Sequence, residues 1–475
     1  MKIGLVIDNP RRDLRGMLLL GYKFLKHKQE VYLIPNYHLF ESFLLNLDWI
    51  ILHNCRDMQN KYIRLYNRMG IKIGVLDTEG AQLGPKNKDL KYFGKVVSKN
   101  ISKIDIYFLW GNLQKKIIEN ELANLKENQK FKNRLVVSGH PRFELYNKDY
   151  RYLYKSIKKN KKIILFNTNF VWNSPRFSQN WEKEMKIGIT QYYGNKKIAE
   201  EKFKDEIMLK SKFIEIIIKI AIKFNNHKIL INPHPFEESS DYKKKVKEIK
   251  NIIVLRDVYL PKLLLNSDFV ISYNCQTCVD SYLMDISTIS INFIDEKKQL
   301  SHYFREISMN IESLDDLYKL INDKNYTNVI DKNYIKTLNH IDDLFLINDS
   351  SSENIIKNIL NLDINNKKNK TLNENLILFF DIFKLRNVGF QSLVLAIIKF
   401  FIILISCSNF FYNLKVYFRN NYKQKKYSNT DIKEFYRLIC GNKNKIHVKN
   451  VYSPKFSFIY KKLSAIKIGW VSNDL

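Results

Sequence analysis

The sequence contains little cysteine for its length. Its 475 residues include five cysteines, a sparse and odd number that does not suit a disulfide framework and predicts a reducing cytoplasm. The five are Cys55, Cys275, Cys278, Cys407 and Cys440. Cys275 and Cys278 form a CxxC pair, but no second CxxC or histidine pair lies nearby to complete a zinc site. We expect two small residues in a packed turn, with a redox pair as the alternative.

Two further patterns are missing. The first ten residues, MKIGLVIDNP, enter a strand pattern after one lysine and lack the long apolar segment of a secretory signal. No RNP-type, zinc-finger or helix-turn-helix pattern occurs. This matters because 79 Lys and Arg against 48 Asp and Glu give a net charge of +31, which would suit a polyanionic partner. A nucleic-acid-binding protein is therefore kept only as the non-enzyme alternative, and we expect no nucleic-acid partner.

Short apolar runs alternate with helix-like stretches through both halves of the chain. In the first half the runs occupy residues 2–8, 31–35, 48–54, 71–77, 105–111 and 134–141. After the lysine-rich stretch 155–162 they resume at residues 162–169, 227–235, 251–257, 267–274 and 287–294. Such alternation predicts parallel sheets covered by helices on both faces. We therefore predict an α/β protein with two Rossmann-like domains, residues 1–150 and 151–365, that face a cleft.

The last part of the chain differs in composition. Residues 366–475 hold 20 Lys and Arg against 5 Asp and Glu, and we predict a separate, basic, partly helical tail. An apolar stretch, Ser392 to Tyr412, lies within it but falls short of the roughly 20 residues of a spanning helix. Basic residues follow in 415–426, so we expect in-plane association with an anionic membrane surface. A buried helix packed on the second domain is the alternative.

Three stretches end predicted strands in polar residues, and ligands of such sheets bind beyond the carboxyl ends of the strands. VLDTEG delivers Asp77 and Glu79 to a turn, although strands also often end in Asp and Gly for turn geometry alone. INPHPFEE places His234 after a strand and Pro235 at the expected first position of a helix, where free N–H groups favour phosphate. SDFVISYNCQTCVDSYLM offers a hydroxyl-rich turn and then a helix beginning near Thr277. Its candidate binding residues are Ser272, Asn274, Thr277 and Asp280.

These three motifs occur in an order that resembles the motif order of a known protein family. An acidic turn before Gly80, then His234-Pro235, then a Ser/Thr turn resembles the pattern of GT-B glycosyltransferases that use CMP-activated ulosonic acids, such as bacterial sialyltransferases and Kdo transferases. The segment SGHPRFE, residues 138–144, is similar to a Gly-Asn-Pro-Arg-Phe-Asp-like segment of bacterial surface carbohydrate biosynthesis proteins. Thr78 stands where that pattern has an acid. His140 replaces its Asn, and we interpret His140 as structural.

The resemblance implies a GT-B-like, metal-independent transferase that needs no cofactor besides its CMP-sugar donor. Glu79, with Asp77 as second choice, would deprotonate the acceptor or attack the anomeric carbon. His234 would stabilise the departing phosphate, assisted by Ser272 and Thr277, while Asp280 would accept from ribose hydroxyls. The acceptor would be a glycan or lipid-linked glycan precursor of capsule or lipopolysaccharide. The expected location is cytoplasmic, peripheral at the inner membrane face.

Other activities of the same fold stay open. CDP-glycerol-type phosphotransferases also use a His-Pro motif, but they usually have Asp-Tyr-Ser-Ser where this chain has residues 271–274. A sugar-nucleotide epimerase of the same two-domain shape is a further alternative. Reading Asp77-Thr78-Glu79 as a metal-binding DxD-like motif conflicts with two successive Rossmann-like domains. The residues do not decide among sialic, legionaminic and Kdo donors, or between inverting and retaining chemistry.

Overall fold

The computed structural model describes most of the chain outside the long basic region. The described residues are 1–36, 39, 42–43, 45–78, 88–124, 126–154, 161–171, 196–235, 237–256, 258–273, 275–295, 307–327, 329, 343, 345–346, 350–362, 427–440, 446–450 and 465–470. They fall into two compact units, one built on residues 1–145 and one on residues 146–338. The predicted boundary at residue 150 lies close to this division.

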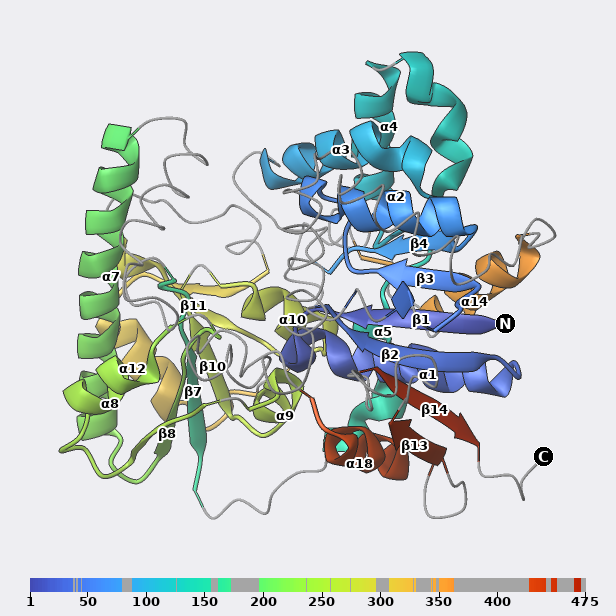
Figure 1. Cartoon of the computed structure of the whole chain (residues 1–475). Coiled ribbons are helices and arrows are strands. Elements are labelled where there is room, and N and C mark those ends of the chain that lie inside the picture. Colours follow the sequence, from blue (N-terminus) through green and yellow to red (C-terminus); the bar gives the residue numbers. More distant parts are fainter. Residues whose placement is uncertain are drawn as a thin grey trace, which may run out of the picture. The chain divides into compact units, whose positions relative to one another are not determined.

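The described strands of the first unit form an eight-stranded sheet in the order β13-β14-β2-β1-β3-β4-β5-β6 (Figure 1). The strands from β1 to β6 are parallel, and only the pairs β13-β14 and β14-β2 are antiparallel. Their bounds are β1 Lys2–Ile7, β2 Glu30–Pro35, β3 Trp49–Leu52, β4 Lys72–Leu76, β5 Ile106–Leu109, β6 Leu135–Val137, β13 Ile446–Asn450 and β14 Ile466–Trp470. The predicted parallel sheet is thus confirmed, and the sequence analysis missed β13 and β14.

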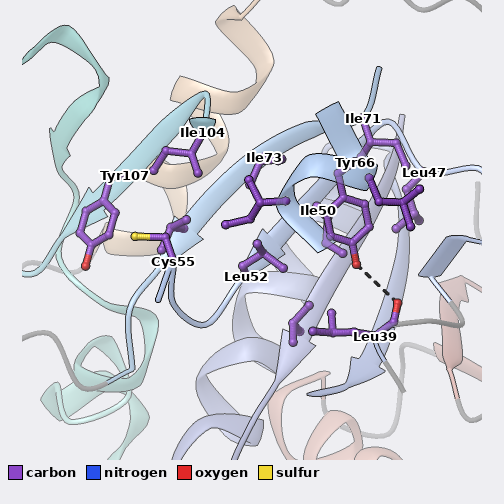
Figure 2. Packing of buried hydrophobic residues seen from close by; sticks show 14 of the residues in the cluster. Leu39, Leu47, Ile50, Leu52, Cys55, Tyr66, Ile71, Ile73, Ile104 and Tyr107 are labelled. Atoms are coloured by element: carbon purple, nitrogen blue, oxygen red, sulfur yellow. Dashed lines mark hydrogen bonds between the residues drawn. The ribbon is translucent and has the colours of Figure 1, made fainter. Parts of the chain in front are cut away.

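Helices accompany this sheet, and their apolar faces supply its core. They are α1 Arg15–Lys26, α2 Asn60–Met69, α3 Lys88–Asn100, α4 Asn112–Ala123, α5 Pro141–Glu144, α14 Ser351–Asn361 and α18 Asn429–Cys440. Figure 2 shows Ile50, Leu52 and Ile73 of neighbouring strands in one buried cluster with Tyr66 of α2. The Tyr66 hydroxyl lies 2.7 Å from the Ser42 hydroxyl, so its polar end is hydrogen-bonded inside the core.

The end of the chain returns to the first sheet. In α18, Ile432, Phe435 and Tyr436 are buried, and the Tyr436 hydroxyl donates to the carbonyl of Leu18 in α1 at 3.1 Å. Strand β14 pairs with β2 beside α1 (Figure 1). A Cβ on Gly21 would lie 2.9 Å from the Ile468 side chain, so glycine permits this close approach.

The predicted separate tail is therefore wrong for its described parts, because residues 427–440, 446–450 and 465–470 belong to the first unit. Helix α14 also belongs there, although the sequence analysis assigned it to the second domain. The Ser352 N–H and hydroxyl donate to the buried Glu144 carboxylate at 2.9 and 2.7 Å, and Lys23 of α1 pairs with the same carboxylate at 2.5 Å. These contacts tie α14 to α5 and α1.

The second unit contains the predicted second parallel sheet. Its described strands have the order β12-β11-β10-β7-β8-β9, all parallel. The strands are β7 Ile163–Asn167, β8 Lys228–Asn232, β9 Ile252–Val254, β10 Phe269–Ser272, β11 Ile289–Ile291 and β12 Met309–Ile311. The helices are α7 Lys196–Lys223, α8 Ser239–Lys245, α9 Leu260–Leu265, α10 Thr277–Leu283 and α12 Leu314–Asn322. Two parallel-sheet units confirm the predicted α/β class.

Candidate functional site

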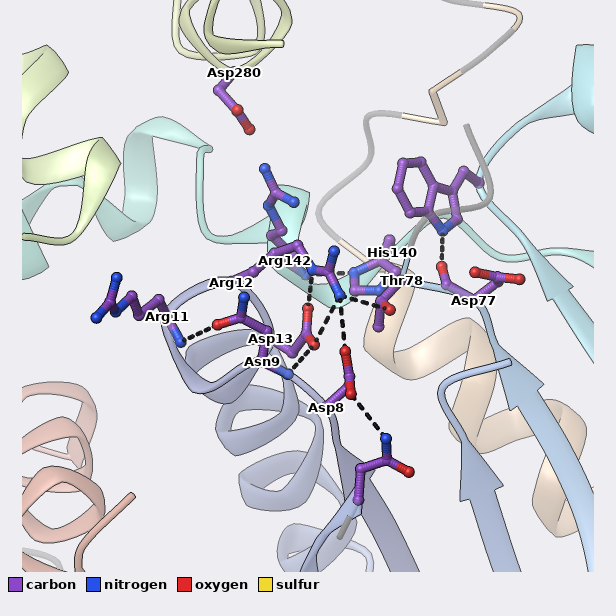
Figure 3. Close-up of polar contacts among 12 residues, drawn as sticks. Asp8, Asn9, Arg11, Arg12, Asp13, Asp77, Thr78, His140, Arg142 and Asp280 are labelled. Atoms are coloured by element: carbon purple, nitrogen blue, oxygen red, sulfur yellow. Dashed lines mark hydrogen bonds and ion pairs between the residues drawn. The ribbon is translucent and has the colours of Figure 1, made fainter. Parts of the chain in front are cut away.

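The carboxyl edge of the first sheet is crossed by a network of charged side chains (Figure 3). Arg12, in the turn after β1, donates through Nε to Asp13 at 2.7 Å and through Nη2 to the Thr78 hydroxyl at 2.9 Å. Its Nη2 also lies 3.6 Å from the Asp8 carboxylate. Asp8 follows β1 and Thr78 follows β4, so Arg12 connects the ends of two parallel strands. The sequence analysis missed Arg12, although the run NPRRD directly after a buried strand was a readable signal.

Asp77 is buried within this edge. Its carboxylate accepts from the Tyr107 hydroxyl at 3.1 Å and lies 3.8 Å from a guanidinium nitrogen of Arg56, and its carbonyl accepts from the Trp110 indole at 2.8 Å. Burial, and then the Asp77 charge, raise the pKa of Tyr107 well above its usual value, so the phenol stays a neutral donor. Asp77 is thus fixed within the strand end. Glu79 and Gly80 lie outside the described residues, and the role of Glu79 stays a prediction.

His53 follows β3 at the same edge and was also missed from the sequence. Its side chain is buried, and its Nδ1 has no hydrogen-bond partner among the residues that the structure describes. Burial lowers the pKa of His53, and this effect exceeds the opposing effect of Asp8, Asp13 and Asp77. Near neutral pH, His53 is therefore an uncharged imidazole beside carboxylates.

His140 has the structural surroundings that were expected. It caps the short helix α5, where its Nδ1 accepts from the backbone N–H of Arg142 at 3.0 Å. Its ring packs edge-on against Trp110 and Phe143, with centroids 5.4 and 5.8 Å away. Burial first, and then the charges of Arg142 and Arg12, lower the pKa of His140 well below its usual value. The imidazole is a neutral part of an aromatic cluster.

The carboxyl edge of the second sheet brings together two of the three predicted stretches, INPHPFEE and SDFVISYNCQTCVDSYLM. Ser272 ends β10 and pairs with Asn167 at the end of β7, while Asn232 ends β8 next to β7. His234 follows β8, and its backbone N–H donates to the Thr168 hydroxyl at 3.1 Å. Ser272 and His234 therefore lie on one edge of a parallel sheet, as predicted, and His234 is only half-buried.

The helix predicted to begin at Pro235 begins later. Helix α8 starts at Ser239, and the Glu238 carboxylate caps it by accepting from the Ser240 N–H at 3.1 Å. A turn intervenes, because the Glu237 N–H donates to the His234 carbonyl at 2.8 Å. The prediction of a helix N-terminus beside His234 is therefore wrong, and Pro235 belongs to the loop between β8 and α8.

The predicted start of α10 at Thr277 is confirmed. The Thr277 hydroxyl lies 3.2 Å from the Cys275 sulfur, and Asp280, one turn inside, accepts from the Tyr146 hydroxyl at 2.8 Å. Ser272, Thr277 and Asp280 are all buried. Asn274 lies outside the described residues. None of these contacts tests the nucleotide-binding roles predicted for these side chains.

The CxxC pair lies in this turn as two buried, free cysteines. Burial raises the pKa of Cys275 to about 11 and that of Cys278 well above its usual value, so both thiols stay protonated. Within the described ranges, no three His, Cys, Asp or Glu side chains are grouped so as to hold a metal ion. The described helices include none that is long and apolar enough to cross a membrane.

Comparison with models of protein families finds no match, and no curated protein matches the chain. Among solved structures, the S. aureus MnaA–UDP co-structure is 13% identical, with a TM-score of 0.43 over 78% of this chain and 99% of that one. The UDP-GlcNAc 2-epimerase from Neisseria meningitidis, bound to UDP-GlcNAc, is 12% identical, with a TM-score of 0.43 over 76% and 100%. The wall teichoic acid polymerase TagF is 11% identical, with a TM-score of 0.42 over 76% and 89%. At TM-scores below 0.5, these likenesses decide neither the fold nor the function.

Proposed function

We propose that the protein is a glycosyltransferase that moves a sialic-acid-like or Kdo-like sugar from a CMP-activated donor to a surface polysaccharide or lipopolysaccharide precursor. The observation that carries the proposal is the carboxyl edge of the second sheet. There a half-buried histidine, His234, follows one strand, while Thr168 and Ser272 supply hydroxyls at the ends of the next two. Ligands of parallel sheets bind at this edge.

In this proposal, His234 donates a hydrogen bond to the phosphate of CMP as the bond to the sugar breaks. Hydroxyls of Ser272 and Thr277 assist, Asp280 accepts from the ribose, and Pro235 and Asn274 complete the nucleotide site. Donors already in place where negative charge develops stabilise the transition state more than water does. CMP carries one phosphate, so the proposal requires no metal to bridge a diphosphate.

Glu79 is the proposed carboxylate that either deprotonates the acceptor hydroxyl or attacks the anomeric carbon. Asp77 is the second choice, because its oxygens already accept from Tyr107 and face Arg56 in a buried site. A carboxylate that must exchange a proton or form a bond needs access to the substrate. This consideration favours Glu79 over Asp77.

Peripheral association with the cytoplasmic membrane face is also proposed. It rests on the apolar stretch 392–412 and the basic residues after it, which lie outside the described residues. The described segments that flank the region, α14 and α18, both pack on α1 of the first unit. The proposed membrane anchor would therefore lie, in sequence, between two segments that belong to the first unit. Replacing Ile402 and Ile403 by Ser should move the protein from anionic vesicles to the free fraction, and unchanged vesicle binding would contradict this proposal.

A thermal-shift panel of CMP, CDP, UMP, UDP and GDP tests the proposed donor. A ligand that binds only the folded state stabilises it by about 2.7 kcal/mol at a hundred times its Kd. We expect CMP to give the largest rise in Tm. A largest rise with CDP would favour the phosphotransferase alternative, and one with UDP would favour the epimerase; either result contradicts the CMP-sugar proposal.

A further inference from the structure

Glu237 follows His234 by three residues in the loop after β8, and it is 2% exposed. Its Oε1 accepts from the Thr168 hydroxyl at 2.6 Å, the Phe170 N–H at 3.0 Å and the His234 N–H at 3.3 Å. Its Oε2 accepts from the Tyr242 hydroxyl. The donors come from the segment after β7, the loop after β8 and helix α8. One carboxylate therefore joins three separate pieces of the second unit at the edge of its sheet.

A buried carboxylate needs this number of donors, because a charged group removed from water is costly unless it is hydrogen-bonded. Lys210 of α7 adds a positive charge nearby. It is buried itself, its ammonium group lies 4.8 Å from the centre of the Tyr242 ring, and it pairs with Asp241 at 3.5 Å. The electrostatic surroundings of Glu237 are therefore built from four elements of one unit.

The backbone of His234 is held twice by this arrangement. Its N–H is shared between the Thr168 hydroxyl and Glu237 Oε1, and its carbonyl accepts from the Glu237 N–H at 2.8 Å. Both peptide groups of the histidine are thus fixed by buried partners, while the residue as a whole is only half-buried. Because the backbone of His234 is held on both sides, the position of its imidazole is set mainly by rotation of the side chain.

We propose that Glu237 is the positioning residue of the nucleotide site: it fixes the backbone of His234 in the loop after β8 and so sets the place of the His234 imidazole. This role rests on the proposed function, since it assigns Glu237 to the same phosphate-binding histidine. Glu237 acts through His234 and Thr168, and it is not itself a ligand for the nucleotide.

The test compares Glu237→Gln with Glu238→Gln in the full-length protein. Gln keeps the size of the side chain but turns one acceptor oxygen toward the same donors as an NH₂ group, so the donors are no longer all satisfied. Glu238→Gln is the matched control, because Glu238 is the adjacent residue of the same loop and its carboxylate caps α8 by accepting from the Ser240 N–H. Two measurements are made on each variant: hydrogen exchange of peptides covering residues 168–170 and 233–242, and the Kd for CMP.

We expect Glu237→Gln to speed exchange of the His234 and Phe170 amides by on the order of tenfold to a hundredfold, the range for a lost hydrogen bond to a charged group. The amides within β8 should keep their protection, and Glu238→Gln should not affect residues 168–170. Affinity for CMP should fall about tenfold or more with Glu237→Gln and little with Glu238→Gln. Unchanged exchange at His234, or equal acceleration throughout the unit, would overturn the positioning role.

A second pair of variants separates positioning from general stability. Thr168→Ser keeps the hydroxyl that joins His234 to Glu237, whereas Thr168→Val keeps the shape and removes it. We expect Thr168→Ser to retain slow His234 exchange and CMP affinity, and Thr168→Val to lose both. Equal behaviour of the two variants would contradict the role. If the unaltered protein binds no CMP, the proposed nucleotide fails, and the exchange results still decide whether Glu237 holds the loop.

Discussion

At the carboxyl edge of the first sheet, charged side chains pair with one another across the ends of neighbouring strands. At the carboxyl edge of the second sheet, one buried carboxylate, that of Glu237, accepts hydrogen bonds from residues of the surrounding loops. The Arg12 guanidinium forms ion pairs with Asp8 and Asp13 and donates a hydrogen bond to the Thr78 hydroxyl. Glu237, in contrast, accepts a hydrogen bond from the backbone of His234, which is a half-buried residue. A polar residue after a strand can thus stabilise the fold through its side chain, as Arg12 does, or be held through its backbone, as His234 is.

The two units also differ in how the chain builds them. The second unit is built almost entirely from one stretch, residues 146–338, whereas the first unit needs α14, α18 and β14 in addition to residues 1–145. Its α1 is covered by elements that follow it by more than 300 residues, as the Tyr436 to Leu18 hydrogen bond illustrates. We therefore expect the first unit, and not the second, to unfold when distant parts of the chain are removed.

Deleting residues 427–475 should give the largest effect. The buried side chains that it removes include Ile432, Phe435, Tyr436, Ile466 and Ile468. At about 1.5–3 kcal/mol for each, the loss is of the order of the whole stability of a domain, about 5–15 kcal/mol. We expect the first unit to unfold while the second resists proteolysis. Truncation after Trp470, which keeps β14, is the control, and a first unit that stays folded without 427–475 would contradict this account.

Replacement of the first-edge carboxylates should give the next largest effect. Glu79→Gln should lower the transfer rate by on the order of a hundredfold or more, as expected for loss of a general base, and leave CMP affinity intact. Asp77→Asn should lower the rate less and reduce stability, because it disturbs the contacts with Tyr107 and Arg56. Steady-state kinetics and thermal melts check both. Near-normal transfer by Glu79→Gln with an inactive Asp77→Asn would move the catalytic role to Asp77.

A smaller effect is expected in the pH dependence of stability. The pKa of His140 is lower in the folded protein than its unfolded value of about 6.5, chiefly because the side chain is buried. The unfolded state therefore binds more protons as the pH falls below about 6.5, and stability present above that pH is lost at up to ~1.4 kcal/mol per pH unit. His140→Asn should remove this contribution and still cap α5, since Asn is a favoured N-cap residue.

Urea unfolding of His140→Asn and the unaltered protein at pH 7 and pH 5 measures this difference. We expect the variant to lose less of its free energy of unfolding between the two pH values. An equal loss in both proteins would show that His140 is not buried as a neutral imidazole.

Apart from β12, Met309–Ile311, which the sequence analysis missed, the parallel strands of both sheets could be predicted because each is a short apolar run bounded by turn residues. The runs KIGLVID and KIILFNTN became β1 and β7 with little change in bounds. Strands β13 and β14 could not be predicted in the same way. They pair with each other, and β14 pairs with β2, which precedes it by more than 400 residues. Composition alone made their segment resemble a basic tail.

For the candidate site, the sequence identified the strand ends but not how each side chain is used. His234 and Ser272 lie on one edge because parallel strands share their direction. That Asp77 is buried against Tyr107, or that Glu237 is a buried acceptor for four donors, depends on contacts between distant segments. The false helix start at Pro235 has the same cause, since Glu237 folds the loop into a turn before α8 begins.

The most direct test of the central claim is the Kd for CMP of the unaltered protein, His234→Ala and His140→Ala, measured by calorimetry. The account predicts that the unaltered protein binds CMP, that His234→Ala weakens binding by about tenfold or more, as for a lost hydrogen bond to a charged group, and that His140→Ala binds CMP normally but unfolds at a lower temperature. Equal loss of CMP affinity in both variants, or unchanged affinity in His234→Ala, would contradict it.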